Sequence, residues 1–120
     1  MNLLNLEEEK FKTIEVKEKK FKIKAIFPRE RILITQRRMG YQNGNPVSSL
    51  SEDEFYFFES IAMCDVCITE MPKGLKENES CINWVDTEMV NLVANEIRKH
   101  TAYIEGELKK NKPSTGIGEE

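Results

Sequence analysis

The segment from Ser51 to about Met71 limits most strongly what this chain can fold into. Ser51 and Glu54 have the spacing of a capping box, so we expect a helix to begin here. The apolar residues that follow are Phe55, Tyr56, Phe57, Phe58, Ile61, Ala62, Met63, Cys64, Val66, Cys67 and Ile68. They cover most of the helix circumference, and such a helix needs neighbours on several sides. The segment is therefore the predicted central core helix, and Pro72 and Gly74 end it.

A long amphipathic helix is predicted from Asp86 to about residue 111. Asp86 is a good N-cap, and Glu88 lies in the first turn. Apolar residues then recur at helical spacing, namely Val90, Val93, Ala94, Ile97, Ile104 and Leu108. We expect this stripe to pack on the central helix. Residues 73–85, which include Trp84, are predicted to be irregular, and residues 112–120 to be a flexible tail.

The N-terminal third predicts a β-hairpin. Residues 11–17 and 21–25 both alternate apolar and polar side chains, as strands with one buried face do. Only a short polar stretch separates the two runs, although it lacks the Asn-Gly or Asp-Gly turn that is typical of hairpins. We expect the lysines of the second run to form a solvated face.

A charged helix is predicted from Pro28 to Met39. Proline is well suited to the first position of a helix, because its missing N–H would have no partner there. Ile32, Leu33, Gln36 and Met39 would share one side of this helix. The run Ile32–Thr35 also has strong β-propensity, so a strand is the competing interpretation. Residues 40–49 contain Gly, Asn and Pro and are predicted to form a loop.

Length and composition indicate one domain. The 120 residues, of which 39% are apolar, are enough for a single core and too few for two. We expect an α+β, mainly helical fold: an N-terminal extension over residues 1–10, one domain over residues 11–111 and the tail over 112–120. No apolar run approaches the roughly 20 residues of a membrane span. Glutamates follow the first six residues at once, which is unlike a signal peptide, so we expect a cytoplasmic protein without a membrane partner.

Charge is distributed unevenly along the chain. Residues 10–38 carry 11 basic and three acidic side chains, whereas residues 51–120 carry 7 basic and 15 acidic ones, within a net charge of -3. Such an asymmetry is informative about partners rather than about the fold. It predicts self-association or docking on a charged client that weakens as salt increases.

The side chains that carry out catalysis or bind metals are few. Cys64, Cys67 and Cys81 together with the single His100 could supply four zinc ligands. Because Cys64 and Cys67 fall inside the predicted core helix, we interpret them as buried, inert thiols. His100 is interpreted as a surface or seam residue, and no glycine-rich phosphate loop is present in the sequence. We therefore expect a non-enzymatic protein without cofactor or metal.

A nucleic-acid-binding regulator is the alternative function. The basic stretch from Lys10 to Arg38 contains Phe11, Phe21 and Phe27, and a mixture of cations and aromatic rings can bind single strands. Against this, the three phenylalanines lie on or next to the predicted apolar face of the hairpin, where a core would need them.

The order of the elements is more informative than any single residue. An aromatic and basic strand, residues 21–27, leads into Pro28; the segment 57–68 then follows, and Trp84 precedes the last helix. Over roughly residues 20–108 this arrangement resembles the small tail assembly chaperones of long-tailed (siphovirus-type) bacteriophages. The resemblance implies a non-enzymatic protein that binds the tape measure protein, helps to recruit tail tube protein in the host cytoplasm, and is absent from the mature virion.

A chaperone of this kind needs exposed apolar or aromatic surface. Four consecutive aromatic residues, 55–58, point around the whole helix, so at least one should be exposed. We therefore predict contacts with the client or with another subunit by a set of six residues: Arg37, Arg38, Phe55, Tyr56, Met63 and Trp84.

Overall fold

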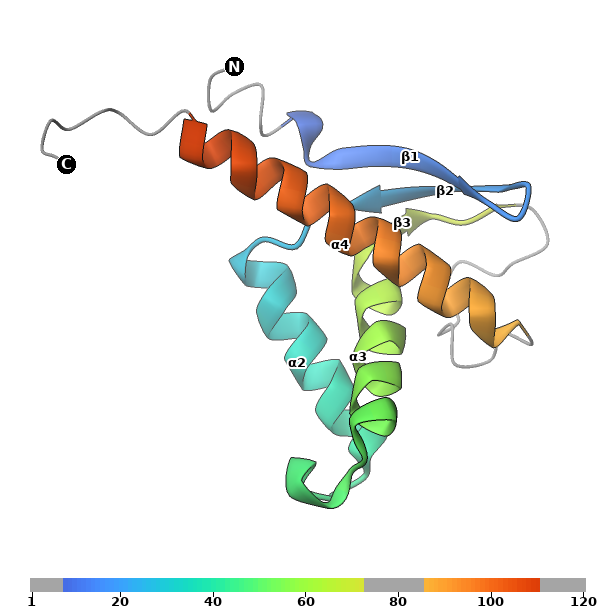
Figure 1. Cartoon of the computed structure of the whole chain (residues 1–120), viewed down its shortest axis with the longest axis vertical. Helices are drawn as coiled ribbons and strands as arrows, with labels where there is room; N and C mark the ends of the chain where they lie inside the picture. Colours follow the sequence, from blue (N-terminus) through green and yellow to red (C-terminus); the bar gives the residue numbers. More distant parts are fainter. Residues whose placement is uncertain (1–7, 73–85, 111–120) are drawn as a thin grey trace, which may run out of the picture.

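The computed structural model describes residues 8–72 and 86–110 (Figure 1). The elements in chain order are strands β1 (Phe11–Val16) and β2 (Lys19–Lys24), helix α2 (Pro28–Gln42), the 3-10 turn Val47–Ser49, helix α3 (Glu52–Cys67), strand β3 (Ile68–Glu70) and helix α4 (Thr87–Lys110). The fold is α+β and mainly helical, as predicted. None of the described helices is long and apolar enough to cross a membrane.

The predicted hairpin is present. Strands β1 and β2 pair antiparallel with Val16 opposite Lys19, which leaves a two-residue turn formed by Lys17 and Glu18. Both turn residues have positive φ, 50° and 67°. Two-residue hairpin turns favour this backbone because its twist matches that of the strands, and Asn-Gly adopts it most readily. The strand pairing therefore imposes a left-handed backbone on two residues that do not prefer it.

Glu18→Gly is expected to stabilise the protein. A left-handed backbone costs an L-residue about 1–2 kcal/mol, whereas glycine adopts it freely but loses about 0.5–1 kcal/mol through its more flexible unfolded state. The net gain should be about 0.5–1 kcal/mol in the free energy of unfolding, measured by urea denaturation. Glu15→Gly, inside β1, is the matched control and should be destabilising. A Glu18→Gly protein less stable than wild type would contradict the turn geometry.

The sheet has a third strand that the sequence analysis missed. The core helix was predicted to run to about Met71, but it ends at Cys67, and Ile68 opens β3 with an extended backbone. β3 pairs antiparallel with β2, placing Ile68 opposite Ile23. Ile68 and Thr69 are β-branched and fit a pleated sheet, and Pro72 disfavours helix before it. Pairing with the edge of β2 therefore overrides the apolar pattern that predicted a helix as far as Met71.

Segment 28–39 is helical, and its strand interpretation is wrong. Pro28 is the first residue of α2, and the carboxylate of Glu30 accepts a hydrogen bond from the Phe27 N–H at 3.0 Å. Glu30 is 2% exposed and forms ion pairs with Lys10 (3.4 Å) and Lys24 (3.3 Å). The helix continues to Gln42, three residues further than predicted. These contacts fix the start of α2 against the sheet.

The core lies between the sheet, α3 and α4. Helix α3 begins with the predicted capping box, in which Ser51 Oγ accepts from the Glu54 N–H at 3.1 Å and Glu54 accepts from the Ser51 N–H at 2.9 Å. Helix α4 has the predicted Asp86 cap, whose carboxylate accepts from the Met89 N–H at 3.1 Å. The buried apolar residues of the main cluster include Ile14, Val16, Phe21, Ile23, Ile61, Ala62, Met63, Val90, Val93, Ala94 and Ile97. Helix α2 packs on α3 beneath this layer (Figure 1).

Candidate functional site

Helix α2 exposes its apolar residues. Ile32 is 60% exposed, Met39 58% and Leu33 40%. Ile34 is the one apolar side chain of this helix that is fully buried. Burial of a large aliphatic side chain is worth about 1.5–3 kcal/mol relative to exposure. Ile32 and Met39 forgo more than half of that gain in the free chain and Leu33 forgoes a smaller part, which makes this face of α2 the leading candidate for a protein-binding surface.

The side of α2 that adjoins this face is held on α3 by polar contacts. Arg37 Nε lies 3.0 Å from Asp65 Oδ2, and the Tyr41 hydroxyl donates to the same carboxylate. The hydrogen bond to Asp65 raises the pKa of Arg37 above its ordinary value, although burial opposes the shift. The Asp65 side chain is 3% exposed, whereas that of Arg37 remains 51% exposed. Arg37 therefore anchors the helix and still presents charge to solvent.

Two hollows border the exposed face. One, of about 440 Å³, lies between α2 and α3 and is lined by Leu33, Gln36, Arg37, Asp65 and Val66. The other, of about 340 Å³, lies where α2 meets the following loop and is lined by Arg38, Met39, Gln42, Gly44, Asn45, Pro46 and Val47. Val47 is itself 51% exposed. The exposed apolar strip of α2 thus has one recess on its α3 side and another at its C-terminal end, and each has room for a partner's side chains.

Two of the predicted contact residues lie together beside this surface. The guanidinium of Arg38 lies over the Phe55 ring, 4.7 Å from its centroid, and also donates to the side chain of Gln42. Phe55 is half-buried. Cations over aromatic faces contribute roughly 0.5–2 kcal/mol, depending on how far they are desolvated. Arg38 and Phe55 therefore belong to the α2–α3 contact, and Arg37 and Arg38 each line one of the two hollows beside the candidate surface.

Tyr56 is separated from that group because it faces α4. Its hydroxyl donates to Asn95 Oδ1 at 3.1 Å and accepts from Arg98 at 2.9 Å. Arg98 also lies over the Tyr56 ring and donates to Ser60 Oγ at 3.2 Å. Tyr56 is 44% exposed, so one of the four consecutive aromatic residues does reach solvent, as predicted. Its polar end joins α3 to α4.

The prediction of a contact role for Met63 is wrong. Met63 is 2% exposed and belongs to the main core cluster. The sequence makes α3 apolar on most sides, but it does not determine which of these sides the sheet and α4 cover. Trp84 lies outside the described residues. The exposed residues Ile32, Leu33 and Met39 were recognised as sharing one side of a helix, but the sequence held no sign that this side faces solvent.

The thiols in the described residues are core residues. Cys64 and Cys67 are completely buried and unpaired, and burial raises the pKa of Cys67 to about 12. The Cys64 thiol donates to the Val90 carbonyl at 3.5 Å. Over residues 8–72 and 86–110, no group of His, Cys, Asp and Glu side chains is arranged to hold a metal ion. Cys81 lies outside these ranges.

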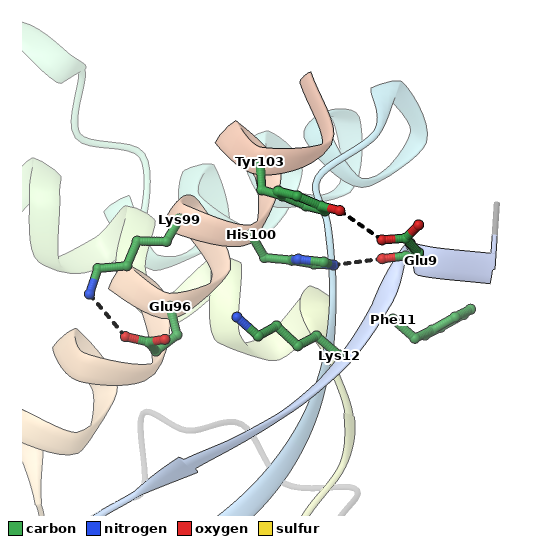
Figure 2. Close-up of a pocket in the computed structure, with 7 residues that line it drawn as sticks. All are labelled: Glu9, Phe11, Lys12, Glu96, Lys99, His100 and Tyr103. Atoms are coloured by element: carbon green, nitrogen blue, oxygen red, sulfur yellow. Dashed lines mark hydrogen bonds and ion pairs between the residues drawn. The ribbon is translucent and has the colours of Figure 1, made fainter. Parts of the chain in front are cut away.

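A further hollow, of about 400 Å³, lies between α4 and β1 (Figure 2). His100 is 5% exposed, and its Nε2 donates to the backbone carbonyl of Glu9 at 2.8 Å. The Tyr103 hydroxyl donates to the Glu9 carboxylate at 2.9 Å. Glu96 accepts from Lys99 at 3.2 Å within the same hollow. His100 is thus a seam residue that ties the start of the sheet to α4, and its charged neighbours are balanced.

The basic hairpin is paired with the acidic part of the chain. Lys17 Nζ lies 2.8 Å from Asp86 and 2.6 Å from Glu88, and Lys22 Nζ lies 3.5 Å from Glu70. The hydrogen bonds that the Lys17 ammonium donates to the carboxylates of Asp86 and Glu88 raise the pKa of Lys17. Part of the positive charge of the hairpin is therefore paired with acidic residues elsewhere in the fold. This pairing reduces the free positive charge that the hairpin offers to nucleic acid.

Comparisons with known proteins add no relative to this description. No protein-family model, no curated protein and no solved structure matches the chain.

Proposed function

We propose that this protein is a non-enzymatic tail assembly chaperone of a long-tailed bacteriophage. It acts in the host cytoplasm, binds the tape measure protein, helps to recruit tail tube subunits, and is absent from the finished virion. The observation that carries the proposal is the exposed apolar face of α2, formed by Ile32, Leu33 and Met39. An apolar patch rimmed by polar residues is typical of a protein-binding site.

The structure of the site suits a chaperone. Arg37 and Arg38 border the apolar residues, so the free protein keeps charge next to its exposed apolar surface and resists aggregation. The same side chains hold α2 on α3, which keeps the surface rigid before the client arrives. A pre-organised surface binds at a lower entropic cost than one that must first fold.

Co-purification with the tape measure protein tests the proposal. The client is the very long helical protein expected to be encoded next to this gene, expressed in overlapping fragments with the tagged chain. We expect at least one fragment to be retained, and the double variant Ile32→Ser, Met39→Ser to retain at least about tenfold less, because it removes the apolar contact. Circular dichroism should remain helical, since both positions are exposed.

The matched control is Leu92→Ser. Leu92 is 38% exposed on α4, away from α2, and this variant should retain the fragment like wild type. Failure of every fragment to bind the wild-type chain would contradict the proposed function.

A further inference from the structure

The charge that α2 presents to a partner is positive only. Its four arginines are Arg29, Arg31, Arg37 and Arg38. Its single acid, Glu30, is 2% exposed and paired with two lysines. Arg29 and Arg31 are exposed and form no ion pair with any residue in the described ranges. A partner approaching α2 therefore meets an apolar strip with the exposed positive charge of Arg29 and Arg31, and with that of the half-exposed Arg37, which is shared with Asp65.

The helical repeat places that charge along the margins of the strip. Ile32, Gln36 and Met39 are spaced by four and three residues and so lie on one line along the helix. Leu33 lies beside this line, and Arg37 follows it one turn later. Arg31 lies on the opposite margin. Apolar residues at this spacing with flanking charges are the pattern by which one helix recognises another.

Gly40 supports the approach of a second helix. It lies inside α2 and is exposed, and a Cβ built there would meet nothing within 4 Å. Gly40 lies in the last turn of α2, where glycine is a poorer helix former than alanine, and its backbone needs no positive φ. A small residue on an exposed helix face allows the backbone of a neighbouring helix to come close.

We propose that α2 docks an amphipathic helix of a partner protein whose apolar stripe is edged by Asp and Glu. This rests on the proposed function, because it specifies which kind of client segment the surface takes. A second copy of this chain, bound symmetrically through α2, would bring arginines onto arginines, which is unfavourable. A lipid surface would leave unused the two hollows beside the strip, which have room for side chains of a partner helix.

Designed peptides test the inference on the full-length protein. One peptide of about 21 residues, which is long enough to form a helix, has leucines along one stripe and glutamates along both margins of that stripe. The control peptide has the same sequence with lysines in place of the glutamates. We expect the glutamate peptide to bind at least about tenfold more tightly in fluorescence anisotropy, with the difference shrinking towards 1 M salt. Equal affinity, or preference for the lysine peptide, would overturn the inference.

Variants of the protein show where the glutamate peptide binds. Ile32→Ser, Met39→Ser should weaken binding of the glutamate peptide at least about tenfold, and Gly40→Gln at least about threefold by blocking close approach, while Leu92→Ser leaves it unchanged. Unchanged affinity in the Gly40→Gln variant would overturn the placement along α2. Two further results would overturn the inference that α2 docks a partner helix. One is stronger binding of the protein to vesicles containing phosphatidylserine than to the peptide. The other is a dimer of the wild-type chain that the Ile32→Ser, Met39→Ser variant no longer forms.

The two proposals fail separately. If the glutamate peptide binds on α2 but no tape measure fragment does, the chaperone function is wrong and the docking chemistry stands. If a fragment binds and the Ile32→Ser, Met39→Ser variant still retains it, the function stands and the α2 inference is overturned.

Discussion

Met63→Ala is expected to lower the free energy of unfolding by about 2–5 kcal/mol. The Met63 side chain is 2% exposed in the core between the sheet, α3 and α4, and truncation of a buried methionine leaves a cavity that the surroundings fill only in part. A domain of this size has a total stability of about 5–15 kcal/mol, so the change could remove a large share of it. Urea denaturation followed by circular dichroism measures the loss.

The same substitution at Met39 is the matched control. Met39 is 58% exposed on α2, and Met39→Ala should change the free energy of unfolding by no more than about 0.5 kcal/mol. The pair thus separates the core methionine from the surface methionine. Similar losses for both variants would contradict the orientation of α2, because they would place Met39 in a packed core.

Glu30→Ala is the second substitution with a large expected effect, about 2–4 kcal/mol of destabilisation. It removes the acceptor of the Phe27 N–H, at 3.0 Å, and the partner that Lys10 and Lys24 share. Removal of the buried carboxylate leaves the Phe27 N–H without its acceptor and leaves the partly buried ammonium groups of Lys10 and Lys24 without a counter-charge. The loss is again measured by urea denaturation at pH 7.

Glu54→Ala provides the control for the capping role alone. Glu54 accepts from the Ser51 N–H at the start of α3, as Glu30 does at α2, but it is exposed. Its loss should cost about 0.5–1 kcal/mol, the usual contribution of a helix cap. Equal costs for the two substitutions would show that the lysine pairs of Glu30 add nothing.

The contribution of Glu30 also depends on pH. Burial raises the pKa of this carboxyl, but the Phe27 hydrogen bond and the pairs with Lys24 and Lys10 outweigh burial, so its pKa lies below the ordinary value of 4.5. The stabilisation is therefore complete above that ordinary value and is lost as the pH falls through the lower native pKa. Between pH 7 and pH 3, the difference in unfolding free energy between wild type and Glu30→Gln should decrease.

Local signals in the sequence predicted most of the architecture. The Ser51–Glu54 box and the Asp86 cap mark helix starts through hydrogen bonds to backbone N–H groups nearby in the chain, and Pro28 marks one because it lacks an N–H. The alternation of Ile14 and Val16 likewise predicts a strand with one buried face. Such features depend on neighbouring residues, so a single sequence is sufficient to find them.

Features that depend on distant segments were missed. β3 exists because β2 offers Ile68 a partner 45 residues earlier in the chain, at Ile23. The periodicity that placed Ile32 and Met39 on one side of α2 is the same whether that side faces a core or solvent. Only the packing of α3 against the sheet and α4 decides that Met63 is buried and that α2 is left with an open face.

The measurement that tests the central claim most directly is an NMR titration of the isotope-labelled protein with a tape measure fragment that co-purifies with it. If α2 is the client-binding surface, the largest amide and methyl shift changes will fall on residues 29–47, centred on Ile32, Leu33 and Met39, and α4 residues such as Leu92 will change little. Shift changes concentrated on α4 or the sheet, with α2 unchanged, would contradict the account.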